Sequence, residues 1–458
     1  MDSTVKRKGG LGFWICNFAF TLERFSFYSV KWLIVNFLIA SVVDGGLGVA
    51  KENGATYQSF FVAFTYLAPL FGSYISDHFV GAKYLVPIGM ALISLGYFFG
   101  FRSSNLTDIA IMIALASIGT GLFKPQTNSI TGKLFSDPKD LDMAFSTQYS
   151  MVNLGSFIGT TSVGLIAGTR GYRICFLVCS IVMLVNAVMF FLGWGPLGEA
   201  GAKPFKDSAE AAASKETIKT AEPSRPLTKI EKQRVLAIIA VSLFSSIFWI
   251  FWYLAYLPVY DHWGAMNDAK EFINMNWKLF GFTIPTSFFD SENGLLCILL
   301  GPALGLLWAR DAKRAGGGLS IFKHTALGMG ILGLAFVVSA FAEITRAGRP
   351  ASLLWVVAFG FGMSLGEMTF SPLGNSFISK FAPGRLLSAM MAVWTFAIFI
   401  AGYSYGNLYN FISKLPFAPA NFGIAALLIV LAAVLWGMDK KLNSLIVSEE
   451  EKEPAENP

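Results

Sequence analysis

The sequence predicts an all-α membrane protein with about twelve transmembrane helices. Of its 458 residues, 54% are hydrophobic and only 14% are charged, whereas a soluble domain carries roughly 25% charged residues. The apolar content is enough for about a dozen helices of about 20 residues, the length that crosses a bilayer. The apolar stretches also fall into two equal sets. Together these observations exclude a soluble enzyme, a disordered chain and a disulfide scaffold.

Apolar runs separated by glycine, proline and charged residues mark the predicted spans. In chain order they cover residues 11–41, 55–77, 84–101, 106–133, 142–168, 172–196, 233–260, 291–309, 320–343, 351–381, 385–413 and 418–438. A polar, proline-containing stretch separates the sixth span from the seventh. We therefore expect an N-terminal six-helix bundle at 1–197, a cytoplasmic linker at 198–232, a C-terminal bundle at 233–442 and a disordered acidic cytoplasmic tail at 443–458. Two halves of six are typical of a transporter built from repeats around a midplane site.

Basic residues in the loops indicate the orientation of the chain. The basic N-terminus, the 198–232 linker, the 310–314 cluster and Lys440 with Lys441 fall on one side if the spans alternate. Cytoplasmic loops are enriched in Lys and Arg, so both termini are predicted to be cytoplasmic. The loop at 261–290, in which four carboxylates including Asp290 outnumber two lysines, is expected on the outside.

Five ionisable residues lie well inside the predicted spans, where a bilayer tolerates few. They are Glu23, Arg24, Lys31, Lys124 and Glu367. Helix neighbours at i and i+1 do not face each other, so we expect Glu23 and Arg24 to need partners on other helices. Three cations against two carboxylates leave one surplus positive charge, which is costly at low dielectric constant unless an anion visits. The pattern predicts a substrate with a carboxylate, or an inorganic anion. The competing interpretation of each charge is a structural ion pair or a side chain that snorkels to the interface.

Lys124 and Glu367 lie in similar local sequences in the two halves. Lys124 follows a Gly-Thr-Gly segment and precedes Pro125, and Glu367 lies between Gly366 and a later Ser-Pro pair. Small residues let helices approach closely, and proline loosens the backbone. Our hypothesis is that Lys124 and Glu367 pair across the cavity in one state and separate in another, each then binding one substrate terminus.

Other chemistries find little support in the sequence. Four cysteines lie in apolar stretches, where thiols usually behave as small hydrophobes; they are Cys16, Cys175, Cys179 and Cys297. The three histidines are not spaced as a metal pair, and neither a nucleophile motif nor a GxxxxGK[ST] loop stands out. We expect no enzyme activity, no metal, no cofactor and no nucleic-acid partner.

Several motifs resemble those of the proton-dependent oligopeptide transporter family of the major facilitator superfamily, and the resemblance covers nearly the whole chain. The family's first-span ExxERFxYY, fourth-span GTGxxKP, fifth-span FYxxINxGS, entry to span eight and tenth-span GExxxSPxG correspond to residues 20–28, 119–125, 148–156, 284–293 and 366–374. The resemblance implies two six-helix bundles around a central cavity, in the major facilitator superfamily fold. It also implies import of di- and tripeptides by proton symport with alternating access, driven by the proton gradient without a cofactor.

By this resemblance, the partners are a small peptide, protons and the lipid bilayer, and the protein is a monomer of the plasma membrane, in particular a bacterial inner membrane. The peptide carboxylate would be held by Arg24, Lys31 and Lys124. Its amino terminus would be held by Asn153, Asn293 and Glu367. Side-chain pockets would be lined by Tyr28, Tyr66, Trp249 and Trp394. For each aromatic residue packing is the competing interpretation, and either asparagine can serve as interhelical glue.

The chain departs from the family at acidic positions. Phe20 replaces the first glutamate of ExxER, and the span-seven glutamate and glutamine after Trp249 are missing, with Tyr253 in that region. Lys31 matches a family arginine that pairs with this glutamate, so Lys31 is predicted to lack its gate partner. Proton coupling is then expected to rest on two carboxylates with nearby cations, namely Glu23 with Arg24 and Glu367 with Lys124.

Two functions stay open at this point. The first is the proton-coupled peptide importer. The second is a non-coupled or exchange carrier of another small carboxylate or anion, such as nitrate or a drug-like peptidomimetic, which the lost acidic positions favour. A membrane enzyme and a purely structural membrane protein are disfavoured, the latter because of the five intramembrane charges.

Overall fold

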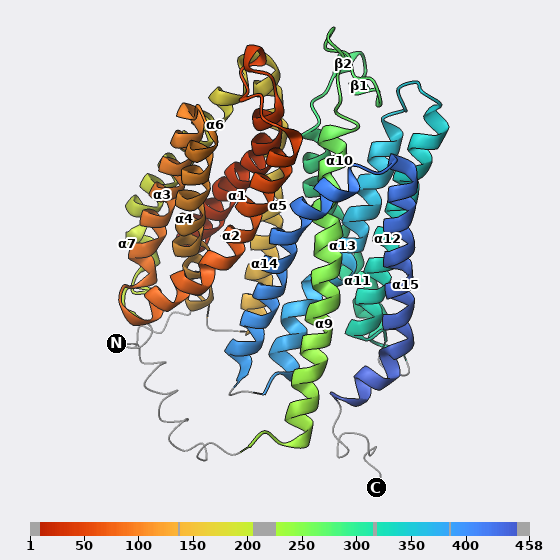
Figure 1. Cartoon of the computed structure of the whole chain (residues 1–458). Helices are drawn as coiled ribbons and strands as arrows, with labels where there is room; N and C mark the ends of the chain where they lie inside the picture. Colours follow the sequence, from red (N-terminus) through yellow and green to blue (C-terminus); the bar gives the residue numbers. More distant parts are fainter. Residues whose placement is uncertain (1–9, 136–137, 205–225, 315–317, 384–385, 447–458) are drawn as a thin grey trace. The chain divides into compact units, whose positions relative to one another are not determined.

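Helices make up nearly all of the protein (Figure 1). The computed structural model describes residues 10–135, 138–204, 226–314, 318–383 and 386–446. Eleven of the described helices are long and apolar enough to cross a membrane. Helix α1 (Gly10–Ile39) has 30 residues and carries Glu23, Arg24 and Lys31, and it brings the set to about twelve. The predicted all-α membrane fold is therefore confirmed.

The chain divides into two compact units. One comprises Met1–Pro223 with Thr283–Leu295, and the other comprises Ser224–Phe282 with Leu296–Pro458. Most of the predicted 198–232 linker and of the 443–458 tail falls outside the described residues, so these boundaries stay predictions. The last helix, α15 (Phe417–Ser444), reaches two residues into the range predicted as tail.

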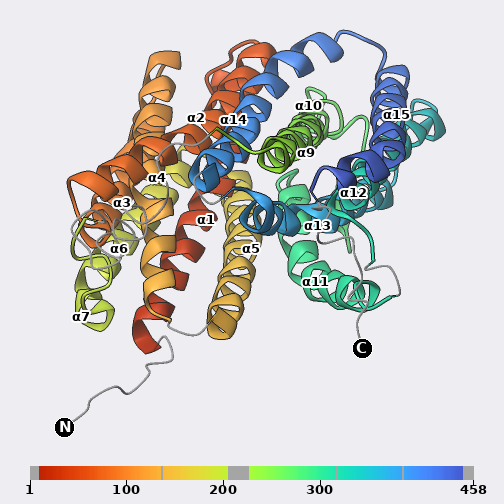
Figure 2. The ribbon, with the colours of Figure 1, turned by 90° about the horizontal axis from the view of Figure 1, so that it is seen from below.

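The first unit is built from the helices of the N-terminal half. These are α1, α2 (Lys51–His78), α3 (Ala82–Arg102), α4 (Leu106–Lys133), α5 (Pro138–Arg170), α6 (Tyr172–Leu192) and the short α7 (Trp194–Leu197), with the 3₁₀ turn η1 (Val42–Asp44). Helix α4 packs against α2 and α3, and α1 packs against α5 and α6 (Figure 2). The opening turns of α11 (Phe288–Asp311) also belong to this unit.

Small residues allow the backbones of these helices to touch. A Cβ atom on Gly72 of α2 would collide with the backbone of Gly121 in the Gly-Thr-Gly segment of α4, and one on Gly155 of α5 would collide with the carbonyl of Thr21 of α1. Close approach through small residues is the usual way in which membrane helices pack. The same contacts hold the charged segment of α1 and Lys124 of α4 in fixed positions within the unit.

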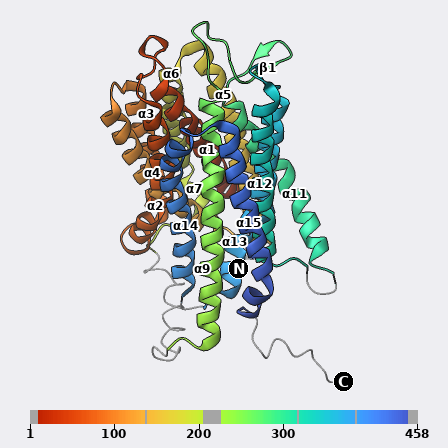
Figure 3. The same cartoon turned by 45° about the vertical axis from the view of Figure 1, so that its right-hand side comes forward.

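The second unit contains the helices of the C-terminal half. These are α9 (Lys229–Leu254), α10 (Tyr256–Asp261), the rest of α11, α12 (Ile321–Arg346), α13 (Leu354–Phe381), α14 (Leu387–Ile412) and α15. A capping box formed by Thr228 and Glu231 begins α9. Helix α12 packs against α13 and α15, and α9 packs against α14. Figure 3 shows α9 and α15 running alongside each other in this unit, where they are also in contact.

The segment between α10 and α11 folds into a small cap with two short strands, β1 (Lys278–Leu279) and β2 (Phe282–Thr283). Its second-unit part is anchored by polar contacts: His262 Nε2 lies 2.8 Å from Glu343 Oε2, and the indole of Trp277 donates a hydrogen bond to the carbonyl of Trp263. The prediction that the loop extends to residue 290 is wrong, because α11 begins at Phe288. Asp290 is therefore a helical residue, and it is 2% exposed.

Candidate functional site

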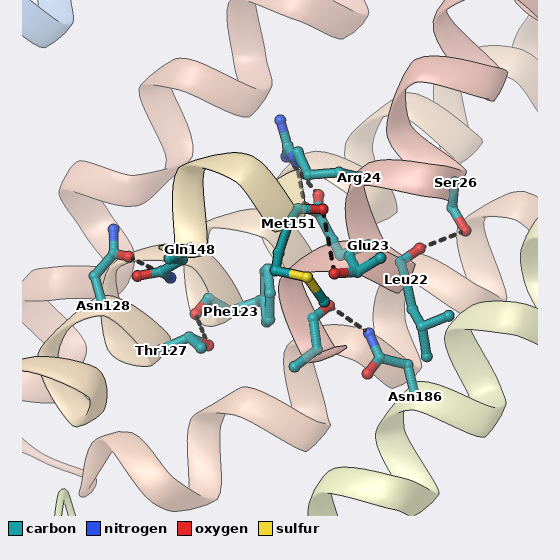
Figure 4. A network of polar contacts seen from close by, with 12 residues as sticks. Leu22, Glu23, Arg24, Ser26, Phe123, Thr127, Asn128, Gln148, Met151 and Asn186 are labelled. Atoms are coloured by element: carbon teal, nitrogen blue, oxygen red, sulfur yellow. Dashed lines mark hydrogen bonds and ion pairs between the residues drawn. The ribbon is translucent and has the colours of Figure 1, made fainter. Parts of the chain in front are cut away.

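Glu23 and Arg24 form a closed pair on α1. Arg24 donates from Nε to Glu23 Oε2 at 2.5 Å and from a terminal guanidinium nitrogen to Oε1 at 2.6 Å, and Figure 4 shows the two side chains curled toward each other. The prediction that helix neighbours cannot neutralise each other is wrong here. Both side chains are buried, and leaving either charge uncompensated costs more than bending two long side chains sideways. The flat guanidinium fork also matches a carboxylate in this bidentate geometry.

Arg24 also contacts aromatic rings. Its guanidinium carbon lies 4.2 Å from the centroid of Phe27 and 5.7 Å from that of Tyr28. The ammonium of Lys31, two turns along α1, lies 5.6 Å from the same Tyr28 ring. Tyr28 therefore stands between two cations, as an aromatic ring does when its face attracts positive charge. The predicted role of Tyr28 in lining a side-chain pocket stays a prediction.

Lys124 lies next to this pair but has no carboxylate of its own. Its ammonium is 4.8 Å from the centroid of Tyr66, and it interacts electrostatically with Arg24 and Glu23. Within the described residues of the first unit it makes neither an ion pair nor a hydrogen bond. The side chain is only partly buried. Of the three intramembrane cations Arg24, Lys31 and Lys124, only Lys124 has no ion pair within the part of this unit that the structure describes.

Two further residues lie against neighbours of Lys124. Phe20, at the position where the resembled family has a glutamate, packs against Phe123 with ring centroids 5.0 Å apart. Tyr97 of α3 is 2% exposed and interacts electrostatically with Glu23 and Arg24. Sequence reasoning missed Tyr97, because a tyrosine in an apolar span carries no signal that separates it from ordinary packing.

Lys31 has a partner that the sequence did not predict. Its ammonium lies 2.9 Å from Asp290 Oδ1, and both side chains are almost fully buried. The span-seven glutamate that the family resemblance pairs with this position is absent, as predicted, but Lys31 is not left without an acid, because Asp290 of α11 takes that role. The backbone carbonyl of Lys31 also accepts a hydrogen bond from Gln58 of α2 at 2.9 Å, and the neighbouring Trp32 donates to Thr286 at 3.0 Å.

The first turns of α11 form a polar seam along α5. The hydroxyl of Ser291 lies 2.8 Å from that of Thr160 and accepts from Thr161 at 2.9 Å. A Cβ atom on Gly294 would lie 3.0 Å from the carbonyl of Asn153, so the predicted residues Asn153 and Asn293 come from contacting turns. The Asn153 amide donates to the carbonyl of Tyr149 within its own helix.

Glu292 lies in the same turns and was also missed. It is 8% exposed, and neither carboxyl oxygen has a hydrogen-bond partner among the residues that the structure describes. The predicted surplus of one cation set Arg24, Lys31 and Lys124 against Glu23 and Glu367; with the buried Asp290 and Glu292 the carboxylates rise from two to four, so that count was wrong. Within α1, α4 and the first turns of α11 alone, the three cations are matched by Glu23, Asp290 and Glu292, and one cation is in surplus only when Glu292 is neutral. The count missed both acids: Asp290 was placed in the loop although α11 begins at Phe288, and Glu292, the second residue of the predicted span 291–309, was not counted among the intramembrane charges.

The second unit holds the other predicted residues. Glu367 of α13 accepts a long contact of 3.8 Å from the thiol of Cys297. One turn further, Phe370 lies 6.5 Å from Trp249, and two turns further a Cβ atom on Gly374 would collide with the ring of Trp394.

Residues at i, i+3 and i+7 share a helix face. One face of α13 therefore carries Glu367 with an indole at each of the next two levels. Lys124 and Glu367 belong to different units, and their predicted pairing stays a prediction.

A sequence profile described as the Major Facilitator Superfamily matches residues 13–402. Among curated proteins, the chain is 28% identical to a peptide transporter, YePEPT, of Yersinia enterocolitica, over 90% of each chain. It is 25% identical to a di-/tripeptide transporter of Lactococcus lactis, over 82% of this chain and 84% of the relative.

Solved structures share the fold. A crystal structure of peptide transporter POT in complex with sulfate aligns with a TM-score of 0.85 at 22% identity, covering 98% of this chain and 97% of the other. A POT family transporter in complex with 5-aminolevulinic acid aligns with a TM-score of 0.83 at 22% identity, covering 94% and 96%. These relatives confirm the resemblance that the span motifs indicate. With most of its length matched by the profile, this chain belongs to the major facilitator superfamily.

Proposed function

We propose that this chain is a secondary active transporter that imports di- and tripeptides by proton symport with alternating access. The proposal is supported by the peptide-transport functions of its relatives and by the superfamily fold. We further propose that it works as a monomer in a bacterial inner membrane with both termini in the cytoplasm, as the basic loops favour.

The observation that carries the proposal is the unpaired ammonium of Lys124 beside the ring of Tyr66. Arg24 and Lys31 already have carboxylate partners at 2.5 and 2.9 Å, whereas Lys124 has none in its unit. Pairing a partly buried cation with an anion is favourable only if further contacts of the anion offset the cost of removing both charges from water. A peptide carboxylate fits this requirement. In this proposal Lys124 binds the carboxylate first, and Arg24 and Lys31 contribute to the electrostatic potential around it.

The other predicted residues take roles in the same proposal. Asn153, Asn293 and Glu367 would bind the peptide amino terminus, and the side-chain pockets would be lined by Tyr28, Tyr66, Trp249 and Trp394. Glu23, closed onto Arg24, and Glu367, in contact with Cys297, are the proposed proton-coupling carboxylates. A carboxylate couples when its environment differs between transport states, which changes its proton affinity.

Reconstitution in liposomes tests the function. The purified protein should accumulate a labelled dipeptide above equilibrium when a pH gradient, acidic outside, is imposed, and should not do so without the gradient. Free amino acids and nitrate are the comparison substrates. Accumulation of nitrate or of an amino acid in place of the dipeptide would overturn the proposal.

A second candidate is the non-coupled or exchange carrier of a small carboxylate or other anion. Two aromatic contacts favour it, because they occupy the regions where the resembled family has acids: Phe20 packs on Phe123, and Tyr253 stacks on Tyr405 at 5.4 Å. Transport of nitrate or of a drug-like peptidomimetic, without gradient-driven accumulation of the dipeptide, would select this candidate.

A further inference from the structure

The carboxyl group of Glu292 is buried without a partner. The side chain is 8% exposed, and both carboxyl oxygens are sealed from solvent and lack a hydrogen bond. Burying an ionised carboxylate in such a place costs roughly several kcal/mol unless a cation or several hydrogen-bond donors face it. A neutral, protonated carboxyl group costs far less. The group is therefore either neutral in this arrangement or matched by a nearby cation.

Among the described residues of the first unit, the helices that contact the first turns of α11 offer no such cation. Helix α1 brings Glu23, Arg24, Tyr28 and Lys31 to the unit, and each of the three charges is already paired: Arg24 with Glu23 and Lys31 with Asp290. Asp290 and Glu292 are two residues apart, about 200° around the helix, so the Lys31 ammonium beside Asp290 lies on the other side from Glu292.

Helix α5 contributes hydroxyls and an amide that are used elsewhere. Thr160 and Thr161 bond to Ser291, and the Asn153 amide bonds to its own helix. Between residues 144 and 164, Tyr149 is the titratable side chain of α5. On α11 itself the titratable neighbours are Asp290 and Cys297, the latter in contact with Glu367. Within the first unit, no charged group among the described residues interacts with Glu292.

We propose that Glu292 is a proton-binding site of the transport cycle, occupied by a proton in the state seen here. The inference rests on the proposed symport function and names a coupling residue that the span motifs do not mark. Because both oxygens are sealed, the amino group of a substrate cannot reach them in this state, whereas a proton needs no space.

The balance of intramembrane charges in the first unit explains how binding of this proton is linked to binding of the substrate. When Glu292 is neutral, Arg24, Lys31 and Lys124 face the carboxylates Glu23 and Asp290, and one positive charge remains for the peptide carboxylate. When Glu292 is ionised, that surplus disappears. Proton and peptide therefore bind cooperatively, and by linkage each raises the affinity for the other by the same factor.

Dipeptide binding to the purified full-length protein, measured across a pH series by calorimetry, tests this site. The wild-type affinity should fall at least about tenfold from acidic to alkaline pH, whereas Glu292→Gln should keep the acidic-pH affinity throughout, since glutamine mimics the neutral acid. Glu292→Asp, which can still titrate, should restore the pH dependence. A dipeptide amide, which lacks the carboxylate, should show a smaller pH dependence in the wild type.

Transport assays provide the second measurement. Glu292→Gln should exchange labelled dipeptide across liposomes at close to the wild-type rate but should fail to accumulate it under a pH gradient. The control is Asp439→Asn, which removes another buried carboxylate. Asp439 pairs with Lys323 near the C-terminal end of α15, and this variant should still accumulate dipeptide. Infrared difference spectra between acidic and alkaline pH should contain a protonated-carboxyl band that Glu292→Gln removes.

The outcomes separate the site from the function. Unchanged pH dependence and accumulation in a folded Glu292→Gln protein would overturn the proton site while leaving peptide symport intact. Accumulation driven by sodium in place of protons would also overturn it. Absence of dipeptide accumulation by the wild type would instead overturn the proposed function.

Discussion

Lys31 on α1 and Asp290 on α11 form a buried ion pair, with Nζ 2.9 Å from Oδ1 and both side chains about 2% exposed. The acid lies in the first turn of its helix, where a negative charge is also favoured by the helix dipole. The pair joins two segments that are more than 250 residues apart in sequence within one compact unit. It thereby fixes the position of Lys31 and removes its charge from the set available to a substrate.

Asp290→Asn should destabilise the protein strongly. Removing one partner of a buried pair leaves an uncompensated charge on Lys31, at a cost of about 3–5 kcal/mol. Replacing both partners, as Lys31→Met with Asp290→Leu, should recover most of the loss because no buried charge remains. Thermal unfolding in detergent measures both variants, and Asp268→Asn in the exposed loop is the control. A melting temperature of Asp290→Asn equal to that of the wild type would contradict the pairing.

Lys124→Gln should weaken dipeptide binding while leaving stability nearly unchanged, because Lys124 has no partner in its unit to lose. Truncating one member of a buried charge pair in a complex costs about 2–5 kcal/mol, or about 30-fold or more in affinity. Equilibrium binding of a dipeptide and of its amide measures this effect. The affinity for the amide should change little; an equal loss for both ligands would show that Lys124 does not bind the carboxylate.

Exchanging the charges tests the predicted pairing of Lys124 with Glu367. The double variant Lys124→Glu with Glu367→Lys should bind dipeptide better than either single variant, because a restored opposite-charge pair recovers coupling energy. Binding measured for all four proteins gives that coupling energy directly. A coupling energy of zero would reject the gate.

Gly121→Ala should destabilise the protein, because a Cβ atom there would lie 2.6 Å from the carbonyl oxygen of Ala68 on α2. Overpacking of this kind costs about 1–3 kcal/mol. Gly132→Ala, on the same helix with open space around the new methyl group, is the matched control and should stabilise by about 0.5–1 kcal/mol. Thermal unfolding of the two variants should therefore shift in opposite directions, and parallel shifts would argue against close packing of α2 and α4.

Local sequence determined the membrane fold. Apolar length is a property of each segment alone, so predicted spans such as 106–133 coincide with helix α4 (Leu106–Lys133) and others differ by a few residues. Local sequence also predicted five of the seven intramembrane charges, all except Asp290 and Glu292, because a charged residue within an apolar run is recognisable without knowledge of its neighbours in space.

The tertiary structure decided which charges are partners and which are not. The Glu23–Arg24 pair contradicts the local helix rule, because burial makes any carboxylate within reach preferable to none. Asp290 and Glu292 stand where a polar loop enters an apolar span, and sequence alone does not tell whether such residues meet water or protein. Only the packing of the α11 entry against α1 and α5 gives Lys31 its acid, leaves Glu292 without a cation and leaves Lys124 open to an anion. An ion pair depends on which helices lie side by side, and that is a property of the folded chain rather than of any one segment.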